Sequence, residues 1–108
     1  MTQKWAGVFP AVTTKFHEDE TLDLPLTARN IQFQLDNGVD GVIVLGSLGE
    51  NGVLDRDEKQ AVIKTAAEVI GGRVPLVTTV AECTTRGACK FVEDAQTNGA
   101  NGFMVLPG

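Results

Sequence analysis

The sequence has little of what a metal site or a disulfide framework needs. Its 108 residues include two cysteines, Cys83 and Cys89, and a single histidine, His17. Structural zinc sites use a C-x2-4-C spacing with two further ligands, whereas these cysteines lie six positions apart and far from His17. We therefore expect no metal ion, and two free thiols, buried or half-buried, in a reducing compartment.

Long apolar runs and an excess of basic charge are missing as well. No segment approaches the roughly 18 consecutive apolar residues of a membrane span, and residues 1–5 lack the apolar core of a signal peptide. Nine Lys and Arg residues against fourteen Asp and Glu residues give a net charge of −5. An acidic chain is a poor partner for a polyanion. We expect a cytoplasmic protein with neither a membrane nor a nucleic-acid partner.

A repeated segment is the most informative feature that is present. Residues 37–46, NGVDGVIVLG, recur slightly altered as residues 98–107, NGANGFMVLP. Asn-Gly suits the end of a helix, because glycine accepts the left-handed conformation that closes the last turn. The apolar run that follows does not alternate with polar residues, so it predicts a strand buried on both faces, as in a parallel sheet. The two copies lie about sixty residues apart, which fits two strand–helix units.

The whole chain continues this pattern of four strands alternating with three helices. Such alternation is typical of α/β proteins with a parallel sheet, either doubly wound or closed into a barrel. The helix that begins near Asp55 has acidic residues in its first turn, as the helix dipole prefers, and Gly71-Gly72 should end it. We predict strands at 7–14, 41–45, 74–80 and 103–106, and helices at about 22–37, 55–70 and 84–98.

An open sheet of four such strands would be an awkward molecule. Three helices cover one face and leave the other face and both edges exposed, although the apolar sequences of the strands predict burial on both faces. Eight strand–helix units, which close a barrel, need about 250 residues. We therefore expect residues 1–108 to be the first part of a longer chain, and we expect them to self-associate when they stand alone.

In parallel α/β proteins the reactive loops lie beyond the carboxyl ends of the strands. The most informative of these loops follows the second strand and begins Gly46-Ser47-Leu48-Gly49-Glu50. Its glycines permit a tight turn whose exposed amides form a nest for a carboxylate or a phosphate, and Ser47 adds a hydroxyl. It is neither a Walker loop nor a dinucleotide fingerprint. On the pattern alone, a purely structural turn is equally compatible with it.

With this loop after its second strand, the chain resembles the dihydrodipicolinate synthase/N-acetylneuraminate lyase family. The family's loop reads Gly-[Thr/Ser]-Thr-Gly-Glu, and the resemblance extends to Gly7–Thr13 and Gly102–Pro107. It implies a TIM (β/α)8 barrel, of which residues 1–108 supply the N-terminal part of a single domain. It also implies a homodimer or homotetramer, and no cofactor.

The resemblance implies a lyase that acts on pyruvate or another 2-keto acid through a lysine Schiff base, or a dehydratase or deaminase that uses the same imine. The lysine and a proton-shuttling tyrosine would lie after residue 108. Carried over by position, Ser47 would bind the carboxylate and relay a proton, the amides of Leu48 and Gly49 would bind the carboxylate, and Glu50 would hold the loop. Leu48 replaces a hydroxyl residue of the family, which makes the pocket more apolar and favours a different 2-keto acid.

The remaining candidates are weaker. Lys15 follows the first strand but precedes a charged, solvated stretch, the opposite of the desolvated setting that a Schiff-base lysine needs. Two alternatives stay open: a phosphate-binding barrel such as a sugar-phosphate isomerase, and a ligand-binding or regulatory barrel without catalysis. We expect solvated helix positions for Lys59, Lys64 and Lys90, and ordinary loop positions for Glu82 and Cys83.

Overall fold

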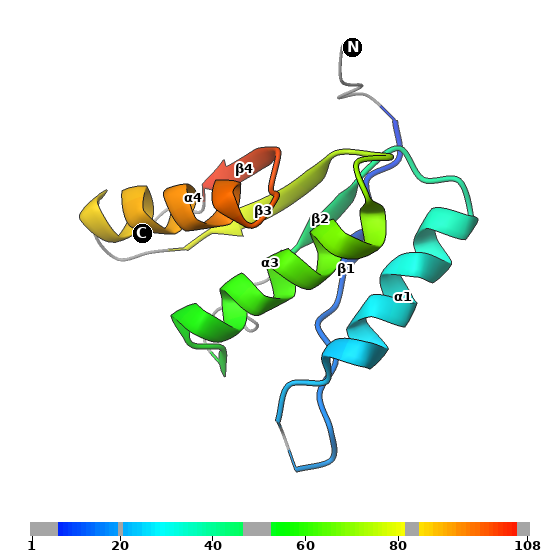
Figure 1. Ribbon diagram of the computed structural model, residues 1–108, viewed down its shortest axis with the longest axis horizontal. Coiled ribbons are helices and arrows are strands. Elements are labelled where there is room, and N and C mark those ends of the chain that lie inside the picture. The colour runs from blue at the N-terminus through cyan, green and yellow to red at the C-terminus, as the bar shows by residue number, and fades with distance from the viewer. Residues whose placement is uncertain (1–6, 20, 47–52, 82–84, 106–108) are drawn as a thin grey trace.

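The computed structural model describes residues 7–19, 21–46, 53–81 and 85–105. Four strands form one parallel sheet in the order β1-β2-β3-β4. The helices between them lie on one face of that sheet (Figure 1). The predicted alternation and the parallel pairing are both confirmed. The elements are β1 (Ala11–Val12), α1 (Leu24–Asp36), β2 (Val42–Val44), α3 (Arg56–Ile70), β3 (Leu76–Val80), α4 (Thr85–Thr97) and β4 (Gly102–Val105).

Local signals in the sequence set the ends of α3. The Asp55 side chain accepts a hydrogen bond from the Glu58 backbone N–H at 2.8 Å, and the Glu58 side chain accepts one from the Asp55 N–H at 3.0 Å. This reciprocal pair is a capping box. At the other end Gly71 adopts a left-handed conformation with φ 59°, and its N–H donates to the Ala67 carbonyl at 2.9 Å. The predicted start and end of this helix are therefore confirmed.

The first strand is shorter than the sequence predicts. Only Ala11 and Val12 pair with β2 as a strand, whereas the prediction covered residues 7–14. Pro10 has no N–H to donate to a ladder, so only its carbonyl is used, and it accepts from the Ile43 N–H at 3.0 Å. The N–H of Val8 is taken by the side chain of Asp40 at 2.8 Å instead of by a neighbouring strand.

The core lies between the sheet and the helices. Alternate strand residues point toward the helices, while Ala11, Ile43 and Val77, which are paired in register across three strands, point to the opposite face. Gly99 lets the end of α4 approach α3 closely, since a Cβ on it would stand 2.5 Å from the Cβ of Ala67. The core includes Val12, Val42, Val44, Leu76 and Val80 from the sheet, and Ile31, Val62, Ile63, Ala66, Ile70, Phe91 and Ala95 from the helices.

Two predictions about individual side chains are wrong. Lys59 is only 6 % exposed, because its side chain turns toward α4 and its Nζ lies 5.9 Å from the centroid of the Phe91 ring. Cys89, expected to be at least half-buried, lies on the exposed side of α4. Lys64 and Lys90 are exposed as predicted.

Large apolar side chains also remain exposed. Phe33 on α1 is 63 % exposed and Val105 on β4 is 74 % exposed. Leu26 lies on the same face of α1 as Phe33, and Met104 is next to Val105 on β4. Both side chains are partly exposed too. None of the helices in the described segments is long and apolar enough to cross a membrane.

Candidate functional site

Because the four strands are parallel, their carboxyl ends meet at one edge of the sheet, where ligand-binding loops are expected. The structure describes the first residues beyond three of these ends: Thr13 after β1, Leu45 and Gly46 after β2, and Ala81 after β3. The predicted site residues Ser47, Leu48 and Gly49 lie outside the described residues, as do Glu50, Glu82 and Cys83. Their roles therefore stay predictions.

Leu45 changes the direction of the chain where it leaves β2. It has a left-handed backbone with φ 57°, a conformation that non-glycine residues rarely adopt. Its side chain is fully buried in the helix-side core, although strict alternation after Val44 would have placed it on the other face. A Cβ on the next residue, Gly46, would lie 3.5 Å from the Cβ of Ala11 and 3.8 Å from Ile43. The loop after β2 therefore starts on the face of the sheet away from the helices.

Strain of this kind costs about 1–3 kcal/mol and tends to occur at binding and catalytic sites. Here it has a definite geometric result, since it places Gly46 next to Ala11 and Ile43 on the face of the sheet away from the helices. No signal in the sequence indicates a left-handed leucine. Sequence reasoning found the segment but missed the left-handed residue that precedes it.

On β3, next to β2 in the sheet, Thr79 is a second polar feature near the same edge. It is fully buried, and its Oγ1 is one of the buried polar atoms of the described chain that have no hydrogen-bond partner. Thr79 lies one residue before the end of β3 and alternates with Thr78 and Val80, so it faces away from the helices. Both Thr79 and Gly46 thus belong to the helix-free face of the sheet at its carboxyl end.

The loop after β1 is fixed to the start of α1. Thr27 is buried, and its hydroxyl donates to the Asp23 carbonyl at 2.8 Å and accepts from the Lys15 N–H at 3.0 Å. Beside it lie charged groups: Nδ1 of the exposed His17 stands 3.3 Å from a carboxylate oxygen of the half-buried Asp23. Hydrogen bonds from the Thr21 hydroxyl and then the Thr21 N–H lower the pKa of Asp19. These surroundings are the wet, charged ones expected for Lys15.

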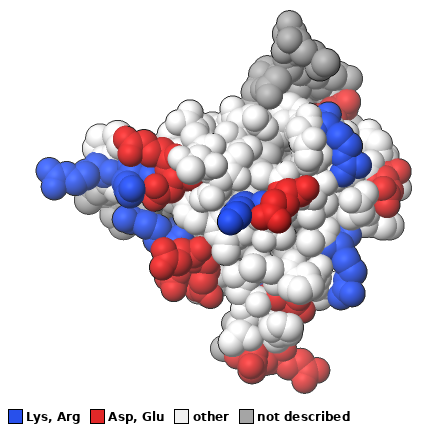
Figure 2. Space-filling view, viewed as in Figure 1, with Lys and Arg blue, Asp and Glu red and all other residues white. Residues whose placement is uncertain are grey.

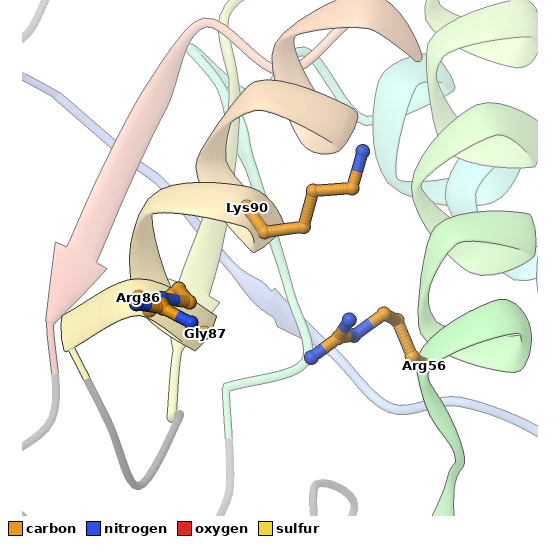
Figure 3. Close-up of a pocket in the computed structure, with 4 residues that line it drawn as sticks. All are labelled: Arg56, Arg86, Gly87 and Lys90. Carbon is orange, nitrogen blue, oxygen red and sulfur yellow. The ribbon is translucent and has the colours of Figure 1, made fainter.

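A hollow of about 400 Å³ opens between the N-terminal ends of α3 and α4, lined by Arg56, Arg86, Gly87 and Lys90 (Figure 3). Sequence reasoning missed this cluster. The available signal was the placement of cations in first turns, where the helix dipole favours acidic residues. Among the residues that the structure describes, no group of three or more His, Cys, Asp or Glu side chains is arranged to hold a metal ion.

With this geometry in hand, comparison with known proteins is decisive. The Dihydrodipicolinate synthetase family matches residues 4–107 of the chain. The chain belongs to this family. The matched range includes the segment Gly46–Glu50 that follows β2.

Relatives within the dihydrodipicolinate synthetase family differ in what they are named for. The chain is 35% identical over 100 residues to a 4-hydroxy-tetrahydrodipicolinate synthase of Thermotoga petrophila, covering 93% of this chain and 34% of that protein. It is 33% identical over 104 residues to a protein of Escherichia coli K12 named as a probable 2-dehydro-3-deoxy-D-pentonate aldolase, covering 96% of this chain and 35% of that one. The chain thus spans about a third of the length of these relatives.

A solved structure of the family extends the likeness to three dimensions. A prophage protein of Escherichia coli K12 that belongs to the dihydrodipicolinic acid synthase family, crystallised in complex with pyruvate, superposes with a TM-score of 0.85 at 35% identity. The match covers 94% of this chain and 34% of that one. The sheet is accordingly part of a (β/α)8 barrel, as predicted, of which this chain supplies β1 to β4. The face away from the helices, which carries Ala11, Ile43 and Gly46, is the barrel interior.

Proposed function

We propose that these residues belong to a lyase that acts on pyruvate or another 2-keto acid through a lysine Schiff base. Support comes from membership of the dihydrodipicolinate synthetase family, whose matched relatives are named as a synthase and an aldolase, one structure holding pyruvate. Fold alone would not carry this, because one barrel hosts many reactions. The feature that supports it most is the sequence Gly46-Ser47-Leu48-Gly49-Glu50 directly after β2, which begins with Gly46 on the face of the sheet away from the helices.

The loop would act on the carboxylate of the keto acid. When the lysine amine adds to the C2 carbonyl and water leaves, the carboxylate must stay fixed so that C2 faces the amine. The backbone N–H groups of Ser47, Leu48 and Gly49 suit this task, because successive amides in a tight turn form an anion nest. The Ser47 hydroxyl would relay the proton to the departing oxygen. The Schiff-base lysine itself would lie outside residues 1–108.

Leu48 points to the substrate class. At this position the family carries a hydroxyl residue, and leucine removes one hydrogen-bond donor or acceptor and adds apolar surface. A keto acid with an additional apolar group gains from such a wall, whereas a small polar substrate loses a partner. We propose that the preferred substrate is a 2-keto acid other than the one used by the dihydrodipicolinate and sialic acid enzymes.

The test is trapping of the imine on the full-length protein. Incubation with pyruvate and borohydride should reduce the imine to a stable secondary amine, seen as a single covalent adduct by mass spectrometry. Ser47→Ala should slow adduct formation about 100-fold, the low end of what a positioned proton-transfer group contributes. The matched control is Thr97→Ala, which removes an exposed hydroxyl that donates to the Glu93 carbonyl at 3.0 Å within the same helix, and it should leave the rate unchanged.

Each outcome separates the alternatives. A protein that binds pyruvate without forming an adduct would be the non-catalytic ligand-binding barrel. A protein that neither binds nor reacts with pyruvate or longer 2-keto acids would overturn the proposal.

Leu48→Thr tests the substrate class. Restoring the family's hydroxyl should shift the ratio of kcat/KM for 2-oxobutanoate over pyruvate toward pyruvate by about tenfold, the range that one methylene is worth in an apolar pocket. An unchanged ratio would show that this side chain does not contact the substrate's variable group.

We also propose that the full-length protein is a homodimer or homotetramer, as the family resemblance implies, with a small 2-keto acid as its partner molecule. Light scattering after gel filtration would test the assembly. The cytoplasmic location stays a prediction.

A further inference from the structure

The inner face of the sheet carries one polar side chain among apolar ones. The strand residues that point away from the helices, in register, are Ala11, Ile43, Val77, Gly102, Thr79 and Met104. Within the described strands, Thr79 is the one member of this set with a polar side chain. The helix-covered side differs, since Figure 2 shows acidic and basic side chains spread over it. To a ligand in the barrel interior, these strands therefore offer a single hydroxyl.

Thr79 lies at the edge of the sheet where ligand-binding loops begin. It is the penultimate residue of β3, and Thr78 before it pairs with Val44 of β2. Gly46, two residues beyond Val44, opens the segment Gly46–Glu50 on the same inner face. The Thr79 hydroxyl is thus on the strand next to the one that leads into the segment proposed to bind the carboxylate.

This hydroxyl has a cost that valine would avoid. Thr79 is fully buried, and among the residues that the structure describes its Oγ1 has no hydrogen-bond partner. Valine has nearly the same shape, is favoured in strands and brings no polar atom to desolvate. A water molecule would need two to four polar partners, but the inward neighbours Val77 and Met104 are apolar. Because buried polar groups in native proteins are hydrogen-bonded, the geometry favours a ligand as the partner of Thr79.

We propose that Thr79 is a substrate-binding residue whose hydroxyl donates a hydrogen bond to the carboxylate of the 2-keto acid. This inference rests on the proposed function. A carboxylate has two oxygens and can accept about four hydrogen bonds, so the hydroxyl adds to the amides of Ser47, Leu48 and Gly49 without competing with them. Its hydrogen bond goes to a charged group away from bulk water, where such bonds are strong. Held from two strands, the carboxylate has less freedom to turn, which fixes the direction of C2.

The test is the dependence of imine trapping on pyruvate concentration in the full-length protein. Thr79→Val should raise the half-saturating concentration about tenfold, the loss expected for one hydrogen bond to a charged group. It should leave the maximal rate unchanged, because a contact made equally before and during the reaction affects binding alone. Thr79→Ser, which keeps the hydroxyl, should behave like the unmodified protein.

Thr78→Val is the matched control. It makes the same substitution one residue earlier on β3, in a side chain that is just as buried but alternates with Thr79 and points toward the helices. Its hydroxyl lies 3.4 Å from the Thr79 carbonyl oxygen. The half-saturating pyruvate concentration should stay unchanged in this variant, and urea denaturation of every variant separates weakened binding from a weakened fold.

Since the carboxylate is common to all 2-keto acids, Thr79→Val should weaken pyruvate and 2-oxobutanoate alike. A changed ratio between them would assign the hydroxyl to the variable group of the substrate and overturn the proposal. An unchanged affinity would also overturn it, as would equal weakening in Thr78→Val.

A second probe separates this inference from the proposed lyase function. Lactate keeps the carboxylate but has no carbonyl, so it binds without forming an imine. In a calorimetric titration, Thr79→Val should lower the affinity for lactate about tenfold, whether or not pyruvate forms an adduct. Equal lactate affinity in all variants, or no binding of lactate, would contradict the role of Thr79. A missing adduct beside weakened lactate binding would overturn the lyase proposal alone.

Discussion

Among single residues, the threonines show how differently buried hydroxyl groups can be used. Thr27 makes two hydrogen bonds that hold the loop after β1 against α1. Thr79 is just as deeply buried, but its Oγ1 has no hydrogen-bond partner among the residues that the structure describes. A buried polar atom left without a hydrogen bond costs roughly 1–3 kcal/mol. Both residues look alike in the sequence, and only the tertiary contacts separate them.

Valine has nearly the shape of threonine, so replacing each threonine by valine measures what its hydroxyl contributes to the free energy of unfolding. Thr79→Val should leave the free energy of unfolding unchanged or raise it by about 1 kcal/mol, while Thr27→Val should lower it by about 1–3 kcal/mol. Urea denaturation of both variants, compared with the unmodified protein, measures this difference. Equal losses in the two variants would mean that the Thr79 hydroxyl does have a hydrogen-bond partner.

The pKa of Asp19 offers a second test at this scale. The Thr21 hydroxyl donates to Asp19 Oδ1 at 2.6 Å and the Thr21 N–H at 3.1 Å, and together they hold the pKa below its ordinary value of 3.8. A lowered carboxyl pKa contributes stability above the unfolded value, which is lost as pH falls through the folded value. Thr21→Val should raise the pKa of Asp19 in an NMR titration without restoring 3.8, because the N–H still donates. An unchanged pKa would contradict the hydroxyl's role.

At the scale of elements, the sequence predicted what local chemistry decides. Asp55 and Gly71 set the start and end of α3 through residues close to them in the sequence. The apolar runs of β2 and β3 predict the burial of these strands. What depends on distant partners was missed or wrong. The burial of Lys59 follows from its contact with Phe91 on another helix, and the left-handed Leu45 has no signal in the sequence.

The capping box of α3 gives a prediction for this element. Asp55→Ala removes the acceptor of the Glu58 N–H and should lower the free energy of unfolding by about 1 kcal/mol. Asp57→Ala is the control, since Asp57 carries the same charge in the same first turn without capping it, and it should cost only a few tenths of a kcal/mol. Similar losses in both variants, measured by urea denaturation, would assign the effect to charge and not to the cap.

The same division holds for the candidate site. The residues Gly46–Glu50 predict an anion-binding turn. Because they follow a parallel strand, the sequence also predicts that they lie at the edge of the sheet where the carboxyl ends of the strands meet. The cationic hollow could not be predicted, because Arg56 and Arg86 are thirty residues apart and meet only when α3 and α4 pack. Ser47, Leu48 and Gly49 remain predictions that imine trapping can test.

For the whole molecule, the exposed apolar surface is the dominant feature. Val105 and Met104 on the edge strand β4, and Phe33 and Leu26 on α1, are the parts of a barrel segment that further strands and helices would cover. Exposed edge strands and large apolar patches promote association. The 108-residue chain on its own should therefore self-associate.

Sedimentation velocity over a range of concentrations tests this expectation. Val105→Lys, which puts a charge on the open edge, should shift the chain toward the monomer. Val53→Gln should not, because Val53 is equally exposed, at 67 %, but belongs to neither β4 nor α1. A monomeric chain that unfolds cooperatively would contradict the prediction, as would an equal effect of both variants.

The strand order β1-β2-β3-β4 is also the order in which the chain is made. On the ribosome, each new strand can therefore dock onto the one synthesised just before it, and no earlier pairing has to be undone. The oldest edge, β1, then waits longest for its second neighbour. Its two-residue length and the donor missing at Pro10 offer other nascent chains little to pair with during that wait.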